Sequence, residues 1–92
     1  MKKILIPTPL RAYTDGQDEI NIENAQTATQ ALKELITRYE DIQQHLYDEN
    51  NQLRKFVNIF INEDDIRHLE KGADTPLANS DVISIVPSIA GG

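Results

Sequence analysis

Alternation of hydrophobic and polar positions predicts two strands near the start of the chain. In residues 2–6 and 19–23, isoleucines occupy every second position. A period of two is typical of strands with one buried face. Pro7 ends the first segment, and the Asp15-Gly16 pair is a turn signal of the kind that joins antiparallel strands. We therefore expect an N-terminal hairpin.

A longer hydrophobic period predicts one main helix after this hairpin. Thr27 and Gln30 have capping-box spacing, in which the threonine hydroxyl accepts the Gln30 amide and the glutamine side chain reaches back. An apolar stripe at helical spacing follows and should pack on the sheet: Ala28, Leu32, Leu35 and Tyr39, flanked by Ala31 and Ile36. From residue 39 to residue 53 the pattern loosens, which predicts a second short helix or an irregular connection.

Two further strands are predicted in the second half. Residues 56–62 alternate, with the aliphatic side chains expected inward, and residues 81–86 are rich in β-branched side chains. Pro87 cannot donate a ladder hydrogen bond, so strand pairing should stop there. Between the two strands we expect a polar turn, a short extended or irregular piece at 66–69, a loop, and Leu77 packed in the core.

The order strand, strand, helix, strand, strand predicts an α+β fold. We expect a mixed sheet of about four to five strands, covered on one face by one main helix, with the first and last strands parallel at its centre. Leu5, Phe60 and Val86 would then form a small apolar patch on the helix-free face, as is typical of a docking surface. We predict one domain over residues 1–86 and a flexible C-terminal tail over residues 87–92.

Composition narrows the classes of function. Ninety-two residues suffice for one modest core, which disfavours a large interior active site. No apolar run approaches the ~20 residues of a membrane span, and residues 4–6 are too short for a signal-peptide core, so we expect a cytoplasmic protein that binds no membrane. The net charge of −6 disfavours nucleic-acid binding, and the absence of cysteine excludes disulfides, thiolate metal sites and a cysteine nucleophile.

Candidate catalytic and metal-ligating residues do not form a motif. His45 and His68 have no partners at zinc-site spacing, and residues 63–65 lack the glycine and the distal glutamate of a calcium loop. Serines and threonines have no histidine–acid arrangement around them, and Gly16 and Gly72 are isolated, so no phosphate-binding loop is indicated. We expect no metal, no bound cofactor and no catalytic apparatus in this chain.

The end of the chain offers a different kind of chemistry. No charged side chain follows the last predicted strand, and the sequence ends in Ala90-Gly91-Gly92. The six residues from Pro87 could extend about 20 Å. So slim a tail could thread a narrow channel and present the Gly92 α-carboxylate, with no Cβ crowding an attack on its carbonyl carbon. A frayed chain end is the alternative interpretation.

Together, the last strand, its proline and the Gly-Gly end resemble the ubiquitin-like sulfur carriers, such as the molybdopterin synthase small subunit and the thiamin-biosynthesis sulfur carrier. Residues 6–11, 54–67 and 81–92 most resemble the sulfur carriers of thiocarboxylate-dependent cysteine biosynthesis. Pro87-Ser88 stands where molybdopterin synthase small subunits often carry two prolines. The resemblance covers nearly the whole chain and implies a ubiquitin-like β-grasp fold.

The resemblance also implies that partner enzymes act on this chain. An activating enzyme would use ATP to adenylate the Gly92 carboxylate, and sulfide or a persulfide would replace AMP to give a thiocarboxylate. In the cysteine pathway, that sulfur would attack an aminoacrylate on a cysteine synthase-like, pyridoxal-phosphate-dependent enzyme, and a zinc peptidase would release cysteine. Gly91 and Ala90 would keep the approach slim, and the apolar patch would bind the partners.

Besides the cysteine pathway, three other functions remain open at this point. The chain could serve molybdopterin, thiamin or another sulfur-containing metabolite. It could be a ubiquitin-like protein modifier that is conjugated to target lysines through Gly92. It could also be a pure interaction domain that uses only the apolar patch.

Overall fold

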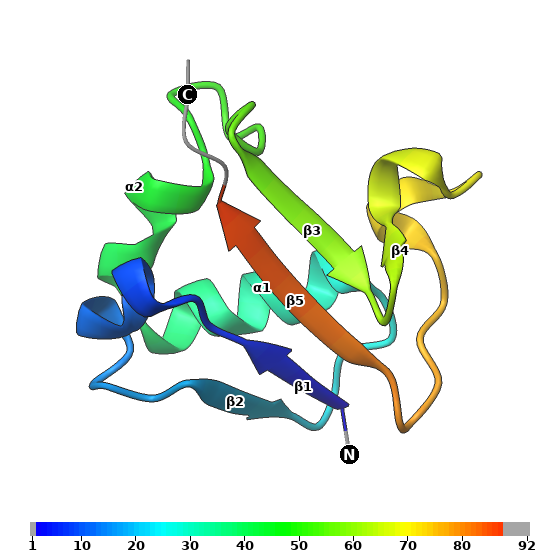
Figure 1. The fold of residues 1–92 in the computed structure, drawn as a ribbon, viewed down its shortest axis with the longest axis horizontal. Helices are drawn as coiled ribbons and strands as arrows, with labels where there is room; N and C mark the ends of the chain where they lie inside the picture. The colour runs from blue at the N-terminus through cyan, green and yellow to red at the C-terminus, as the bar shows by residue number, and fades with distance from the viewer. Residues whose placement is uncertain (1, 88–92) are drawn as a thin grey trace.

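The computed structural model describes residues 2–87 and contains a five-stranded mixed sheet in the order β2-β1-β5-β3-β4. The strands are β1 (Lys2–Leu5), β2 (Glu19–Ile22), β3 (Val57–Ile61), β4 (Asp64–Asp65) and β5 (Val82–Pro87). Helix α1 (Ala28–Arg38) crosses one face of the sheet, behind β5 in Figure 1, and the short helix α2 (Gln43–Leu46) lies beside it. The prediction of an α+β fold with one main helix is confirmed.

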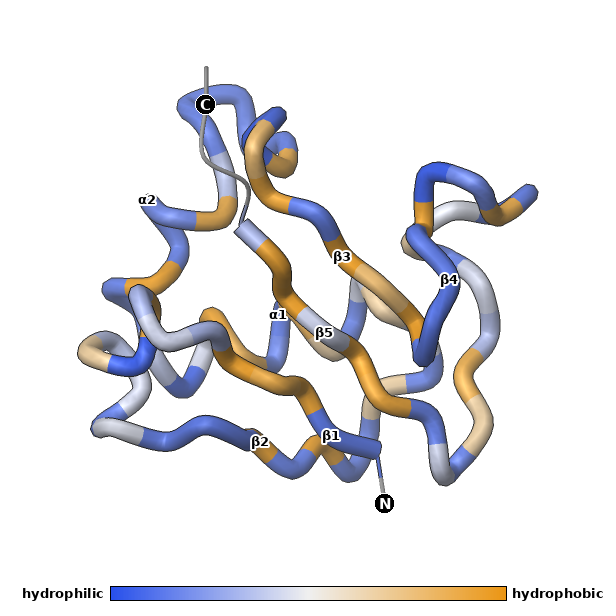
Figure 2. Tube along the Cα trace, viewed as in Figure 1, coloured by the Kyte–Doolittle hydropathy of each residue, from blue (hydrophilic) through white to orange (hydrophobic). Residues whose placement is uncertain are grey.

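Strand β5 is the centre of the sheet. It pairs in parallel with β1 and antiparallel with β3, which confirms the predicted central pairing of the first and last strands. The register places Ile20, Ile4, Ile83 and Ile61 in one row across four strands, and all four are buried. Figure 2 shows the hydrophobic stretches of β1, β3 and β5 side by side. Each such side chain contributes about 1.5–3 kcal/mol on burial, so this row is a major part of the core.

Thr27 caps the start of helix α1, as predicted. The Thr27 hydroxyl accepts a hydrogen bond from the Gln30 amide at 3.2 Å. The reciprocal bond differs from the prediction, because the Gln30 side-chain oxygen accepts the Gln26 amide at 2.7 Å instead of that of Thr27. Ile36 and Tyr39, also in the predicted stripe, are partly buried. The other four residues of the stripe are fully buried: Ala28, Ala31, Leu32 and Leu35.

The connection from β1 to β2 is more structured than the predicted hairpin turn. The two strands are antiparallel as expected, but a 3-10 helix (Thr8–Tyr13) lies between them. Proline in the first turn of this helix favours it, because an amide hydrogen is not needed there. Asp15 and Gly16 both have positive φ, 54° and 79°, and they close the 3-10 helix rather than join the strands directly.

The remaining connections are short helical turns. A 3-10 turn (Glu40–Ile42) leads into α2, so of the two predicted alternatives the structure has the second short helix. Residues 66–69, predicted as extended or irregular, instead contain a 3-10 turn (Ile66–His68), because the Asp65 side chain accepts the Arg67 amide at 2.9 Å and caps it. A further 3-10 turn (Gly72–Asp74) lies in the expected loop, and Leu77 packs against the core.

Within residues 2–87, no helix is long enough and apolar enough to cross a membrane.

Candidate functional site

The carboxyl end of β5 is the root of the predicted tail. The register of β5 with β1 ends at Ser84, whereas its register with β3 continues to Pro87, which lies opposite Val57. The last three residues of β5 therefore pair with β3 alone, and the strand projects past the end of β1. Pro87 therefore lies within β5, one residue beyond the predicted end of the strand, although it has no amide hydrogen of its own to donate to the ladder. The predicted site residues Ala90, Gly91 and Gly92 lie outside the described residues.

The predicted patch residues lie on the sheet face that α1 leaves uncovered. Leu5 and Phe60 both lie opposite Ser84, one on each side of β5. Val86 is the next outward-facing residue of β5 and lies opposite Asn58. Leu5 and Phe60 are partly buried and Val86 is 43% exposed. Because the side chain of Ser84 is small, the surface between Leu5 and Phe60 is lower than at these two residues.

Phe56 extends this surface toward the root of the tail. It is the turn residue immediately before β3, next to the Val57–Pro87 pair at the end of the β3–β5 ladder. Its exposed fraction is 52%, above that of Val86. The alternation of residues 56–62 predicted an outward position, but the predicted patch did not include Phe56; its spacing of four residues from Phe60 was the available signal. We call Leu5, Phe56, Phe60 and Val86 the apolar face.

A polar rim borders the apolar face on the β2 side. Glu19 lies directly opposite Leu5 in the adjacent strand, and its carboxylate is 3.5 Å from the Lys3 ammonium. Both side chains are substantially exposed, so this ion pair contributes little to stability. An apolar centre with a charged border is the usual organisation of a protein-binding surface.

The two histidines lie on separate elements, His45 in α2 and His68 in the 3-10 turn Ile66–His68. His45 stacks on Tyr13, with ring centroids 4.2 Å apart, and its Nε2 atom is buried without a hydrogen-bond partner. His68 is exposed at the end of the 3-10 turn that follows β4. Between Lys2 and Pro87, no group of three or more histidine, cysteine, aspartate or glutamate side chains is arranged to hold a metal ion.

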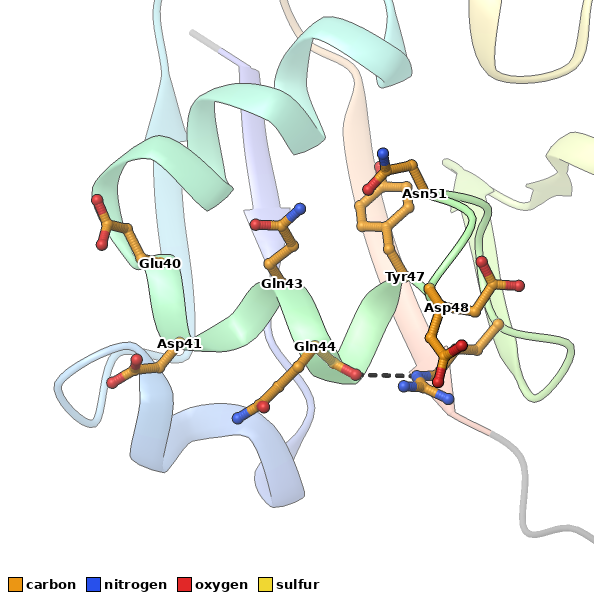
Figure 3. Close-up of a pocket in the computed structure, with 9 residues that line it drawn as sticks. Glu40, Asp41, Gln43, Gln44, Tyr47, Asp48 and Asn51 are labelled. Atoms are coloured by element: carbon orange, nitrogen blue, oxygen red, sulfur yellow. Dashed lines mark hydrogen bonds between the residues drawn. The ribbon is translucent and has the colours of Figure 1, made fainter.

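The segment that contains α2 forms a surface depression of about 440 Å³ (Figure 3). Its lining comes from one stretch of chain: Glu40, Asp41, Gln43, Gln44, Tyr47, Asp48, Glu49, Asn51 and Arg54. Arg54 donates from Nε to the Gln44 carbonyl at 2.9 Å. Four carboxylates against one guanidinium disfavour a nucleotide here. Burial raises the pKa of Tyr47, so its phenol stays protonated at neutral pH and is not a general base.

Comparisons with known proteins agree with one another. A model of the ThiS family matches residues 4–92. The sulfur carrier protein CysO of Mycobacterium tuberculosis is 34% identical over 91 residues, which cover 97% of this chain and 96% of the relative. The crystal structure of Mycobacterium tuberculosis CysO has a TM-score of 0.84 at 31% identity and covers 97% of this chain and 100% of its own.

Two further solved structures are similar over nearly their full length. The crystal structure of the Amycolatopsis orientalis BexX/CysO complex has a TM-score of 0.86 at 27% identity, with 100% of both chains covered. The solution structure of small archaeal modifier protein 1 from Methanosarcina acetivorans has a TM-score of 0.82 at 31% identity, with 99% of this chain and 95% of that chain covered. The fold is therefore the ubiquitin-like β-grasp that the sequence resemblance implied.

Proposed function

This chain belongs to the ThiS family of sulfur carriers, and from that premise we propose that it carries sulfur as a thiocarboxylate on Gly92 for cysteine biosynthesis. A sulfur carrier is a substrate of its partner enzymes rather than an enzyme. The observation that most supports a role for the tail is the position of β5. Its carboxyl end projects from the centre of the sheet beside the apolar face, so a partner that binds this face also meets the root of the tail.

Chain geometry limits the partner's active site. Five residues follow Pro87, and they span at most about 17 Å when fully extended. A partner that contacts the apolar face must therefore have its reactive centre within that distance of the docked sheet. The absence of charged side chains in residues 88–92 suits a narrow channel of low polarity.

The proposed chemistry has two steps at the Gly92 carbonyl carbon. A carboxylate is a poor electrophile, so the activating enzyme first joins it to the α-phosphate of ATP and releases pyrophosphate. Sulfide then attacks the acyl carbon and AMP leaves, which gives the thiocarboxylate directly. A persulfide sulfur would instead give an acyl disulfide, from which a thiol of the partner enzyme releases the thiocarboxylate by forming a disulfide with the donor sulfur. ATP binds to the activating enzyme, and we propose that this chain needs no cofactor of its own.

The thiocarboxylate is the sulfur nucleophile that the next partner consumes. We propose that this partner is a cysteine synthase-like enzyme that depends on pyridoxal phosphate, with a zinc peptidase releasing cysteine from Gly92. Similarity to a protein named CysO over 97% of the chain supports this pathway over molybdopterin or thiamin synthesis. The apolar face is proposed as the surface that both the activating and the accepting enzyme contact.

The first test of this proposal is intact mass spectrometry. The purified chain is incubated with its activating enzyme, ATP and sulfide, and a mass change of one oxygen to one sulfur is expected. The matched control is the chain without Gly92, which should fold identically by circular dichroism and gain no sulfur. If the full chain is adenylated by an active enzyme but never acquires sulfur, the carrier proposal is wrong.

A second measurement tests the pathway. The thiocarboxylate form is presented separately to a cysteine synthase-like enzyme, a thiazole synthase and a molybdopterin synthase large subunit. When the first enzyme is supplied with the amino-acid substrate that gives its aminoacrylate, conversion of the Gly92 thiocarboxylate to a cysteine adduct is expected, with the cysteine sulfur coming from the chain. Consumption of the thiocarboxylate by either of the others, but not by the first, would assign the chain to that pathway instead.

Conjugation to proteins is a second candidate function. The likeness to a small archaeal modifier protein, at 31% identity, favours conjugation over a role as a pure interaction domain. A modifier would appear in cells as a ladder of covalent adducts on denaturing gels, each dependent on Gly92. A pure carrier would appear as a single band, and this is the result we expect.

A further inference from the structure

The sheet has two outer edges, and on each an arginine side chain binds main-chain carbonyls. One edge is β2, and the other is the part of β3 that the two-residue strand β4 does not cover. Carbonyls and amides on an open edge are a template for pairing with another extended chain. Edge strands in native proteins are commonly protected against such pairing, and charged side chains are one means of doing so.

Arg38 covers the edge of β2. The Ile6 amide donates to Asp18 at 2.9 Å, so alternation along the antiparallel ladder points the Asn21 carbonyl away from β1. Arg38, in the last turn of α1, donates from Nη1 to that carbonyl at 3.0 Å. Its Nη2 is 2.6 Å from the Glu34 carboxylate one helical turn earlier, and this ion pair holds the guanidinium in place.

Arg67 covers the other edge. Strand β4 pairs only with Phe60 and Ile61, so it does not extend as far as Val57 at the start of β3. Arg67 donates from Nη2 to the carbonyls of Lys55 at 3.2 Å and Val57 at 3.3 Å. Two separate elements thus place the same kind of side chain over outward-facing carbonyls.

We propose that Arg38 and Arg67 are edge caps that prevent a second copy of this chain from adding a strand to the sheet. The sequence itself provides a suitable strand, because residues 88–92 carry no charged side chain. A guanidinium is always ionised, so an added strand must displace a charge from its carbonyl and leave it beside the new ladder. The edge caps thereby keep one copy from capturing the tail of another. The inference concerns the sheet edges and holds whether or not Gly92 accepts sulfur.

The test compares the oligomeric state of Arg38→Ala, Arg67→Ala and the double variant with that of the unaltered chain, by light scattering during size-exclusion chromatography over a range of concentrations. Lys33→Ala and Lys71→Ala are the matched controls, since each removes one exposed positive charge near the same element. We expect the double variant to self-associate at least about tenfold more tightly than the unaltered chain, because each charge-assisted hydrogen bond to an edge is lost. The two controls should not differ from the unaltered chain.

The same double variant truncated after Pro87 identifies the strand that is added. Loss of the association on truncation assigns it to the tail, and its persistence assigns it to edge-to-edge pairing; both outcomes support the edge caps. Circular dichroism verifies folding, and if Arg67→Ala does not fold, Arg38→Ala alone carries the test at the β2 edge. A folded variant that associates no more than Lys33→Ala overturns the inference.

Discussion

Asp81 joins the start of β5 to the turn after β3, and its removal should destabilise the fold. One carboxylate oxygen accepts a hydrogen bond from the Asn62 side chain at 3.0 Å, and the other accepts one from the Ala78 amide at 2.8 Å. Asn62, which has a φ of 56°, accepts in turn from the Val82 amide at 3.0 Å. This network fixes the residue at which the central strand begins.

The substitution Asp81→Ala removes two hydrogen bonds to a charged acceptor. Such bonds contribute about 1.5–3 kcal/mol each in buried settings, but Asp81 is partly exposed and solvent screens it, so we expect a combined loss of about 1–2 kcal/mol. For a domain of this size that loss lowers the Tm by roughly 5–12 °C. Most of this loss of stability should also appear when Asn62 is substituted, because each of the two side chains orients the other.

The loss should depend on pH. Hydrogen bonds from the Asn62 side chain and the Ala78 amide, with a smaller contribution from the charge of Lys2, hold the pKa of Asp81 below its ordinary value. A lower pKa in the folded state stabilises the protein at pH values above the unfolded pKa of about 3.9. That stabilisation disappears as the pH falls through the folded value. The difference between the unaltered chain and Asp81→Ala should therefore shrink below about pH 4.

Urea unfolding followed by circular dichroism, at neutral pH and below about pH 4, measures this difference. Glu63→Ala is the control, because it removes the same charge from an exposed position next to Asn62 in the turn after β3. Asn62→Gly removes the partner side chain and keeps the positive φ, so a double-mutant cycle with Asp81→Ala gives the coupling free energy. Equal stabilities of Asp81→Ala and Glu63→Ala at neutral pH, or a gap that persists in acid, would refute the reasoning.

Three other predictions concern docking, packing and capping. Phe60→Asp should weaken binding to the activating enzyme by tenfold or more and leave the Tm within a few degrees of the unaltered chain, because Phe60 is outside the core; unfolding of this variant would contradict its outward placement. His45→Phe should keep the stack on Tyr13, remove a buried unsatisfied nitrogen and raise stability by about 0.5–1.5 kcal/mol in urea titrations, whereas a loss would mean that Nε2 has a partner. Thr27→Ala should cost about 1 kcal/mol through the lost cap of α1, and Thr27→Ser should restore most of it.

Periodic segments could be predicted because burial repeats with the backbone. Ile59 and Ile61 alternate with Asn58 and Phe60, and only one register puts the aliphatic side chains against α1. The same alternation placed Phe60 outward, where the structure has it. The central position of β5 followed from its β-branched composition together with the order of the elements.

Contacts without a period could not be predicted. The 3-10 helix between β1 and β2 is too short to show a hydrophobic repeat, and the stack of His45 on Tyr13 joins residues that are distant in sequence. The assignment of chemistry to Gly92 came from resemblance and remains a prediction, since that residue lies outside the described range.

The central place of β5 also governs when the protein can form. Lys3 and Val82 are partners in the sheet across 79 residues of chain, and β5 separates β1 and β2 from β3 and β4. Before β5 is available, these two pairs of strands have no ladder between them. Contacts of such long range make folding slow, because the entropy of closing the loop is lost before the contacts form. A growing chain would thus complete its sheet only after residues 82–87 have been made, so that the two halves of the sheet would join in a single late event.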